Sequence, residues 1–102
     1  MAPFSYMPYF VYIIYSTKLD RYYIGSTSNV EERLKKHNHI HKGYTKAGQP
    51  WILVYHETWN LKSAALAREK QLKNWKNRDR IKNLINDGPG NALNSVGSEH
   101  PD

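Results

Sequence analysis

The chain has 102 residues, 39% of them hydrophobic, which fits one small domain with a modest core. It contains no cysteine, which excludes a disulfide framework and a thiolate zinc site and favours a reducing, cytoplasmic compartment. Fifteen lysines and arginines against nine aspartates and glutamates give a net charge of +6, which favours nucleic acid as partner before a membrane surface. The apolar run near the N-terminus stops at Ser16 and is too short to span a bilayer, so we expect no membrane partner.

Two short strands are predicted near the start of the chain. Residues 9–15 are aromatic or β-branched, and after "STKLD" a second run, "RYYIG", follows, so a β-hairpin is expected. If the loop has two or four residues, Tyr12 and Tyr23 share one face of the hairpin, roughly 7–8 Å apart. A three-residue loop or a bulge would place them on opposite faces.

A helix is predicted next. Ser28 and Glu31 have the spacing of a capping box, so the helix should begin at Ser28 and end near Asn38 or Ile40. "HKGYTKAGQP" then has the composition of a loop. "WILVYHET" predicts a third strand, and its nearly continuous apolar run predicts that this strand is central and covered on both faces.

Arg33 and His37 lie one turn apart on the predicted helix. Val30 and Leu34 define its apolar stripe, and at 100° per residue the arginine and the histidine fall beside that stripe. Both are therefore expected at the border of the core. Each also has an ordinary structural explanation, Arg33 as a surface cation with a packed stem and His37 as a residue favoured near a helix C-terminus.

The C-terminal part predicts two helices and a tail. Residues 61–75, with Asn60 or Ser63 as the first residue, are rich in good helix formers. A short helix over residues 78–85 should pack Ile81, Leu84 and Ile85 and end at "NDG". Residues 87–102 offer little to bury and are expected to be disordered.

These elements predict an α/β domain over residues 9–86, preceded by an extension over residues 1–8. The order strand, strand, helix, strand, helix, helix gives a small, mostly antiparallel three-stranded sheet flanked by helices. There is no nucleotide-binding glycine motif. The alternating histidines of "HNHIH" hint at metal, but a helix end scatters such side chains around its axis, so a site made of histidines alone is not expected.

Glu69 has an unusual predicted position. The stripe formed by Ala65, Leu66 and Leu72 has Glu69 at its angular centre, which turns a carboxylate toward the core at a cost in desolvation. A functional role and a structural pair with Lys73, four residues on, are equally supported. The lysines and arginines around it either line a phosphate-binding surface or only solvate the helices. The candidates for that surface are Lys35, Lys36, Lys42, Lys46, Arg68 and Lys73, with Lys70 and Lys76 beside them.

Taken in order, these residues resemble a known family. Tyr12, then Tyr23-Ile24-Gly25, then Arg33, and Glu69 inside "AALAREKQLKNW" are similar in type and spacing to the GIY-YIG nuclease superfamily. The resemblance is closest to its small stand-alone bacterial members, and it extends to the N-terminal nuclease domain of the excision-repair nuclease. It covers residues 9–85. The first motif departs from the family name, since it reads Phe10-Val11-Tyr12.

The resemblance implies a metal-dependent endonuclease that hydrolyses phosphodiester bonds in DNA, with a role in repair or recombination. Glu69 would bind a single Mg²⁺ or Mn²⁺ ion, Arg33 would contact the scissile phosphate, and Tyr12 would hold the water or a partner hydroxyl. Either Tyr23 or His37 would be the general base, and Gly25 would serve the motif structurally. Ser26 stands where some relatives carry a lysine.

Two other classes of function fit the same composition. A nucleic-acid-binding module would keep the fold and the basic face without cleaving, and a protein-interaction domain would show no salt-sensitive affinity for DNA. RNA is an alternative substrate. We expect a cytoplasmic monomer whose targeting depends on nucleic-acid structure or on a partner protein, since no second DNA-binding domain is evident.

Overall fold

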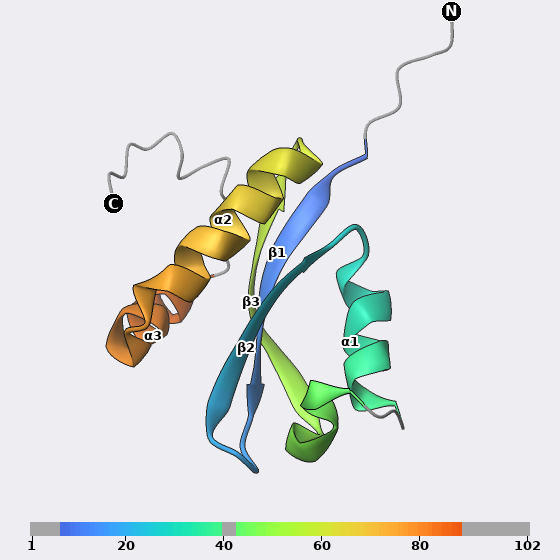
Figure 1. Cartoon of the computed structure of the whole chain (residues 1–102), viewed down its shortest axis with the longest axis vertical. Helices are drawn as coiled ribbons and strands as arrows, with labels where there is room; N and C mark the ends of the chain where they lie inside the picture. Colours follow the sequence, from blue (N-terminus) through green and yellow to red (C-terminus); the bar gives the residue numbers. More distant parts are fainter. Residues whose placement is uncertain (1–6, 40–42, 89–102) are drawn as a thin grey trace, which may run out of the picture.

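In the computed structural model, the described residues are 7–39 and 43–88. The predicted α/β class with three antiparallel strands and three longer helices is confirmed (Figure 1). Most of the predicted N-terminal extension and C-terminal tail lies outside the described residues. The elements are β1 (Tyr9–Ser16), β2 (Arg21–Thr27), α1 (Val30–Asn38), the 3₁₀ helix η1 (Tyr44–Gly48), β3 (Trp51–Trp59), α2 (Lys62–Trp75) and α3 (Arg78–Asn86).

The strands form one sheet in the order β2-β1-β3. The prediction that the third strand is central is therefore wrong, because β1 is hydrogen-bonded on both sides and β3 lies at an edge. The apolar run of β3 supplies the buried Trp51 and Tyr55, while Ile52 between them is 51% exposed. In β1 the four residues Val11–Ile14 are all buried, and they include a tyrosine.

Helices cover both faces of the sheet (Figure 1). On one face, Val30 and Leu34 of α1 pack against Tyr12, Ile14 and Trp51. On the other face, α2 and α3 supply Ala65 and Leu72, which pack with Val11, and Ile81, which packs with Ile13 and Tyr55. Strand β2 is the second edge of the sheet, and Figure 1 shows it between α1 and α2.

The hairpin register agrees with the prediction from loop length. A four-residue loop joins β1 to β2, so Ile14 pairs with Tyr23 and Tyr12 pairs with Gly25. Because side chains alternate along a strand, Tyr12 and Tyr23 share the face that α1 covers. The prediction that both tyrosines lie on one face is confirmed.

The predicted helix starts were less accurate than the strand register. Asn29, not Ser28, is the N-cap of α1, and its side chain accepts a hydrogen bond from a backbone N–H of the first turn. At the start of α2, Leu61 occupies the N-cap position with no side-chain hydrogen bond, so neither Asn60 nor Ser63 caps that helix. Packing against the sheet therefore fixes α2 more than its own first turn does.

Glu57 is a buried charge that the sequence did not indicate, since it is only 1% exposed in β3. Its carboxylate accepts hydrogen bonds from the Tyr55 hydroxyl at 2.6 Å and from Trp59 Nε1 at 3.0 Å. The Arg68 guanidinium of α2 donates to both carboxylate oxygens at 2.9–3.1 Å. A buried carboxylate is tolerated when it is paired and fully hydrogen-bonded, so this network holds α2 against β3.

Replacing Glu57 with glutamine should destabilise the fold. Glu57→Gln keeps the shape but removes the charge that faces Arg68, and hydrogen bonds to charged groups contribute about 1.5–3 kcal/mol. We expect the free energy of unfolding, measured by urea denaturation, to fall by about that amount. Glu31→Gln on the exposed side of α1 is the matched control and should change it by less than about 0.5 kcal/mol. Equal effects of the two substitutions would contradict this role of Glu57.

Candidate active site

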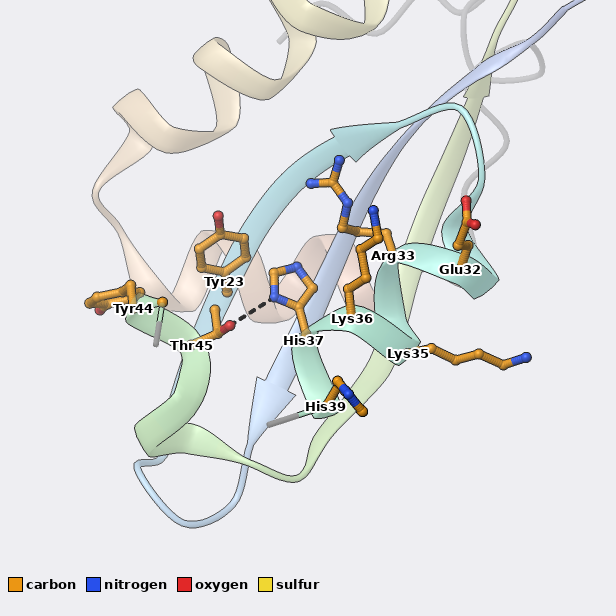
Figure 2. Close-up of a pocket in the computed structure, with 10 residues that line it drawn as sticks. Tyr23, Glu32, Arg33, Lys35, Lys36, His37, His39, Tyr44 and Thr45 are labelled. Carbon is orange, nitrogen blue, oxygen red and sulfur yellow. Dashed lines mark hydrogen bonds between the residues drawn. The ribbon is translucent and has the colours of Figure 1, made fainter. Parts of the chain in front are cut away.

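Tyr12 and His37 are joined in the interior of the α1 face. The Tyr12 hydroxyl lies 2.9 Å from His37 Nε2. On the other side of the ring, His37 Nδ1 lies 3.0 Å from Thr45 Oγ1, as Figure 2 shows. Tyr12 is 2% exposed and His37 7% exposed, so the histidine lies deeper than the predicted border of the core. With both ring nitrogens engaged, the orientation of the imidazole is fixed by β1 and η1.

Tyr12 remains protonated at neutral pH. Burial, the nearby Tyr23 and, more weakly, the Glu69 carboxylate raise the pKa of Tyr12 to about 12, although the charge and hydrogen bonding of Arg33 act in the opposite direction. A phenol with this pKa holds its proton through the physiological range, so Tyr12 is not a general base there. Tyr23, Arg33 and Glu69 thus all influence the proton affinity of this one hydroxyl.

Tyr23 lies at the open side of this cluster. Its ring packs edge-on against His37, with 5.0 Å between ring centroids, and lies 6.2 Å from the rings of Trp51 and Tyr44. An open depression of about 650 Å³ extends from Tyr23 along α1 to Arg33 and Lys36. Figure 2 shows His37 directed toward Tyr23, whereas Lys35 and His39 point away from both. Tyr23 and Arg33 thus line the open depression together with the mostly buried His37, whereas Tyr12 lies behind them in the core.

Gly25 is required by the close approach of Tyr12 across the two strands. A Cβ atom built on Gly25 would lie 2.4 Å from the Tyr12 hydroxyl oxygen and 2.6 Å from its Cζ. These distances are impossible for a real contact, so any larger residue must displace the Tyr12 ring. The glycine after Tyr23-Ile24 therefore permits the hydrogen bond between Tyr12 and His37.

Gly25→Ala should lower stability through this contact. Overpacking of a dense site costs about 1–3 kcal/mol, and we expect that loss in the free energy of unfolding. In a Tyr12→Ala background the clash is gone, so the same Gly25→Ala change should cost less than about 0.5 kcal/mol, with the difference measured as a double-mutant cycle. If the substitution costs the same in both backgrounds, contact with Tyr12 is not the reason for glycine.

Glu69 approaches the same region from the other face of the sheet. It was predicted at the centre of the apolar stripe of α2, but Leu66 is 44% exposed, so the buried stripe is Ala65 and Leu72, and Glu69 lies at its border. Its carboxylate accepts a hydrogen bond from Ser26 Oγ at 2.5 Å and pairs with Lys73 Nζ at 2.7 Å. Since Ser26 follows Gly25 on edge strand β2, this hydrogen bond holds the carboxylate beside that edge, next to the residue that packs against Tyr12.

The predicted cations are not all in one place. Lys35 and Lys36 line the depression on the α1 side, together with Arg33. Lys73 lines a second depression of about 500 Å³ beside α2 and α3. Arg68 is instead paired with Glu57 of β3, and 19% of its side chain is exposed. Of the remaining candidates, Lys76 also lines the second depression, Lys46 and Lys70 are exposed, and Lys42 lies outside the described residues.

Two contact residues of the site are not predicted by the sequence. Thr45 fixes His37, but it lies in a segment with loop composition, and nothing in its neighbours indicates that contact. Ser26 stands out only as a departure from the family pattern, although its hydroxyl binds Glu69. Among residues 7–39 and 43–88, no group of three or more metal-ligating side chains occurs. In the same part of the chain, no helix combines the length and apolar character of a membrane span.

Comparison with known proteins shows the family of the chain. Residues 8–84 match the model of the GIY-YIG catalytic domain. The UPF0213 protein SH2523 of Staphylococcus haemolyticus is 40% identical over 76 residues, which are 72% of this chain and 90% of that protein. The UPF0213 protein SSP2268 of Staphylococcus saprophyticus is 36% identical over 81 residues, 78% of this chain and 96% of that protein. No solved structure matches at comparable significance. The chain therefore belongs to the GIY-YIG nuclease family.

Proposed function

We propose that this chain is a divalent-metal-dependent endonuclease that hydrolyses phosphodiester bonds in DNA. The proposal is supported by the contacts of Tyr12 and Tyr23 with His37, at an open basic depression that Arg33 also lines, and by Glu69, which Ser26 holds beside edge strand β2. These side chains come from two strands and two helices, and the buried core uses only Tyr12 and His37 among them. A net charge of +6 suits a polyanionic substrate.

The donor chemistry around Glu69 fits one magnesium or manganese ion. Ser26 and Lys73 each occupy one carboxylate oxygen, but a carboxylate has about four lone-pair sites, so donor capacity remains. With one carboxylate at this position, the ion would keep water molecules and take further ligands from substrate phosphate, as magnesium commonly does. When bound, such an ion neutralises charge on the phosphate and lowers the pKa of a bound water. The role of Ser26 and Lys73 is to hold the carboxylate at the edge of β2.

The remaining side chains divide the other tasks. Arg33 would contact the scissile phosphate, where its planar fork donates two hydrogen bonds to phosphate oxygens. Tyr12, which stays protonated, would hold His37 and a neighbouring hydroxyl or water rather than accept a proton. The general base is Tyr23, which opens into the depression, or His37, whose ring is fixed by Tyr12 and Thr45. Both remain candidates.

The competing proposal is a nucleic-acid-binding module that does not cleave. A cleavage assay separates the nuclease from the binding module. The intact chain is incubated with labelled plasmid, duplex, branched and single-stranded DNA and with RNA. Each substrate is combined with Mg²⁺, Mn²⁺ or EDTA. We expect phosphodiester cleavage that needs the metal and is absent in the Glu69→Gln variant prepared in parallel. Salt-sensitive binding without cleavage of any substrate would establish the binding module instead.

DNA binding should be mainly electrostatic. The proposed surface comprises Lys35, Lys36, Lys46 and Lys73, and it offers cations rather than an element shaped to enter a groove. With about four phosphate contacts, affinity should fall roughly a hundredfold between about 50 and 200 mM salt. Fluorescence anisotropy in EDTA measures the slope, and duplexes of unrelated sequence should bind alike. A slope near zero, or strong preference for one sequence, would contradict this surface.

A further inference from the structure

Tyr44 is an exposed aromatic residue that the proposed chemistry does not use. It begins η1 and is 73% exposed, whereas the next residue, Thr45, is buried. Thr45 is tied to His37 Nδ1 through its hydroxyl and to Trp51 Nε1 through its carbonyl oxygen at 2.7 Å. The backbone beside Tyr44 is therefore fixed by the candidate active site itself, and the exposed ring is presented at a defined place.

The ring of Tyr44 continues the aromatic surface of Tyr23. Their centroids are 6.2 Å apart and their planes are tilted by 34°, while Tyr23 is supported from behind by His37 and Trp51. In Figure 2, Tyr44 lies at the outer end of this row, beyond Tyr23. We refer to Tyr23 and Tyr44 as the tyrosine ridge. It is anchored at one end in the core and open to solvent at the other.

The tyrosine ridge separates two basic depressions, and both of its residues line both of them. Along α1 the first depression carries Arg33, Lys35 and Lys36, with Glu32 as the acidic member. The second depression has cations of β2, α2, α3 and the connection between the two helices, and of these Lys73 is paired with Glu69 and Arg78 with Asp20. A polyanionic strand that crosses the ridge thus meets cations before and after it. The cations of the second depression are Arg21, Lys73, Lys76 and Arg78.

Aromatic rings between basic grooves suit nucleic acid whose bases are free. In a duplex the bases are stacked inside the helix, and their faces reach a protein ring only after unpairing. In single-stranded segments each base has a free face, and stacking on an aromatic ring contributes to binding without regard to sequence. From this geometry, and resting on the proposed nuclease function, we propose that Tyr44 stacks on an unpaired base beside the scissile phosphate. The chain would then select single-stranded or locally unpaired nucleic acid over continuous duplex.

Binding in EDTA tests this proposal separately from cleavage. The probes are a fluorescein-labelled single-stranded DNA of mixed sequence, the same strand as RNA, and the fully paired DNA duplex. We expect the unmodified chain to bind the single strands more tightly than the duplex. Tyr44→Ala should weaken single-strand binding roughly ten-fold or more, because the ring that stacks on an unpaired base is removed. Duplex binding should stay within about two-fold of the parent, because no base is free to stack there.

Two further variants keep the test specific. Tyr44→Phe retains the ring and should bind single strands like the parent chain. Leu61→Ala removes another exposed apolar side chain, which is 64% exposed at the N-cap of α2, and should change neither affinity. Duplex binding as tight as single-strand binding, or a Tyr44→Ala change that is equal for all probes, would overturn the proposal. Because no step requires cleavage, that result would leave the nuclease proposal standing.

Discussion

Glu69→Gln should abolish metal-dependent cleavage while the protein stays folded and still binds DNA. The change keeps the shape of the side chain but removes the carboxylate that we assign to the metal. Loss of a single charge-stabilising group typically costs about 10²–10³-fold in rate, and loss of the metal ligand should reach at least the upper end of that range. The loss is measured from initial cleavage rates of the parent and the variant on the best substrate, over a range of Mg²⁺ or Mn²⁺ concentrations.

Stability measurements separate this role from a structural one. Glu69 pairs with Lys73, whose side chain is 50% exposed, and such helical pairs contribute only about 0.3–0.5 kcal/mol. The amide oxygen of glutamine can still accept the Ser26 hydrogen bond. We therefore expect the free energy of unfolding to change by less than about 1 kcal/mol. If the purified variant cleaves at the parental rate, Glu69 only anchors α2 and the proposed metal site is wrong.

Arg33→Lys should reduce cleavage well over ten-fold while changing DNA affinity by less than about 1–2 kcal/mol. Lysine keeps the positive charge near Tyr12 but cannot present two parallel N–H donors to one phosphate. The paired hydrogen bonds to the phosphate, which strengthen in the transition state, are therefore lost. The long-range attraction between the positive charge and the DNA phosphates is kept. Single-turnover rates and anisotropy titrations in EDTA give the two quantities independently.

The same exchange elsewhere on the protein provides the control. Arg80 of α3 stacks on Trp75, with its guanidinium carbon 4.0 Å from the ring centroid, on the side of the sheet that α1 does not cover. Arg80→Lys should leave both the cleavage rate and DNA affinity at parental values. Should Arg33→Lys weaken binding and cleavage to the same degree, Arg33 is a binding residue and not a catalytic one.

Local patterns determined the strands and their register. The loop between the first two strands has an even number of residues, and alternation along each strand then forces Tyr12 and Tyr23 onto one face. Ile81 of α3 was predicted as a core residue by helical periodicity, and it is buried. Such features depend on neighbours in the sequence, so the sequence alone predicts them well.

The order of the strands was decided by tertiary packing. An apolar run such as that of β3 shows that a segment has residues to bury, but not whether strands pair on one side of it or on both. Here β1, with its buried tyrosine, accepts both neighbours. Arg68 is a similar case, because only the folded chain brings the buried Glu57 within 2.9 Å and removes the arginine from the proposed DNA surface.

The sequence by itself determined the residue types of the candidate site and the placement of the two tyrosines on one face. What only the tertiary structure decided is how Glu69 joins them. It lies at the border of the α2 stripe, on the opposite face of the sheet from Tyr12, and approaches the shared site past Ser26 at the edge of β2. The physical reason is that β2 is an edge strand, where Gly25 leaves room for the Tyr12 ring on one face and the next residue, Ser26, holds the Glu69 carboxylate on the other.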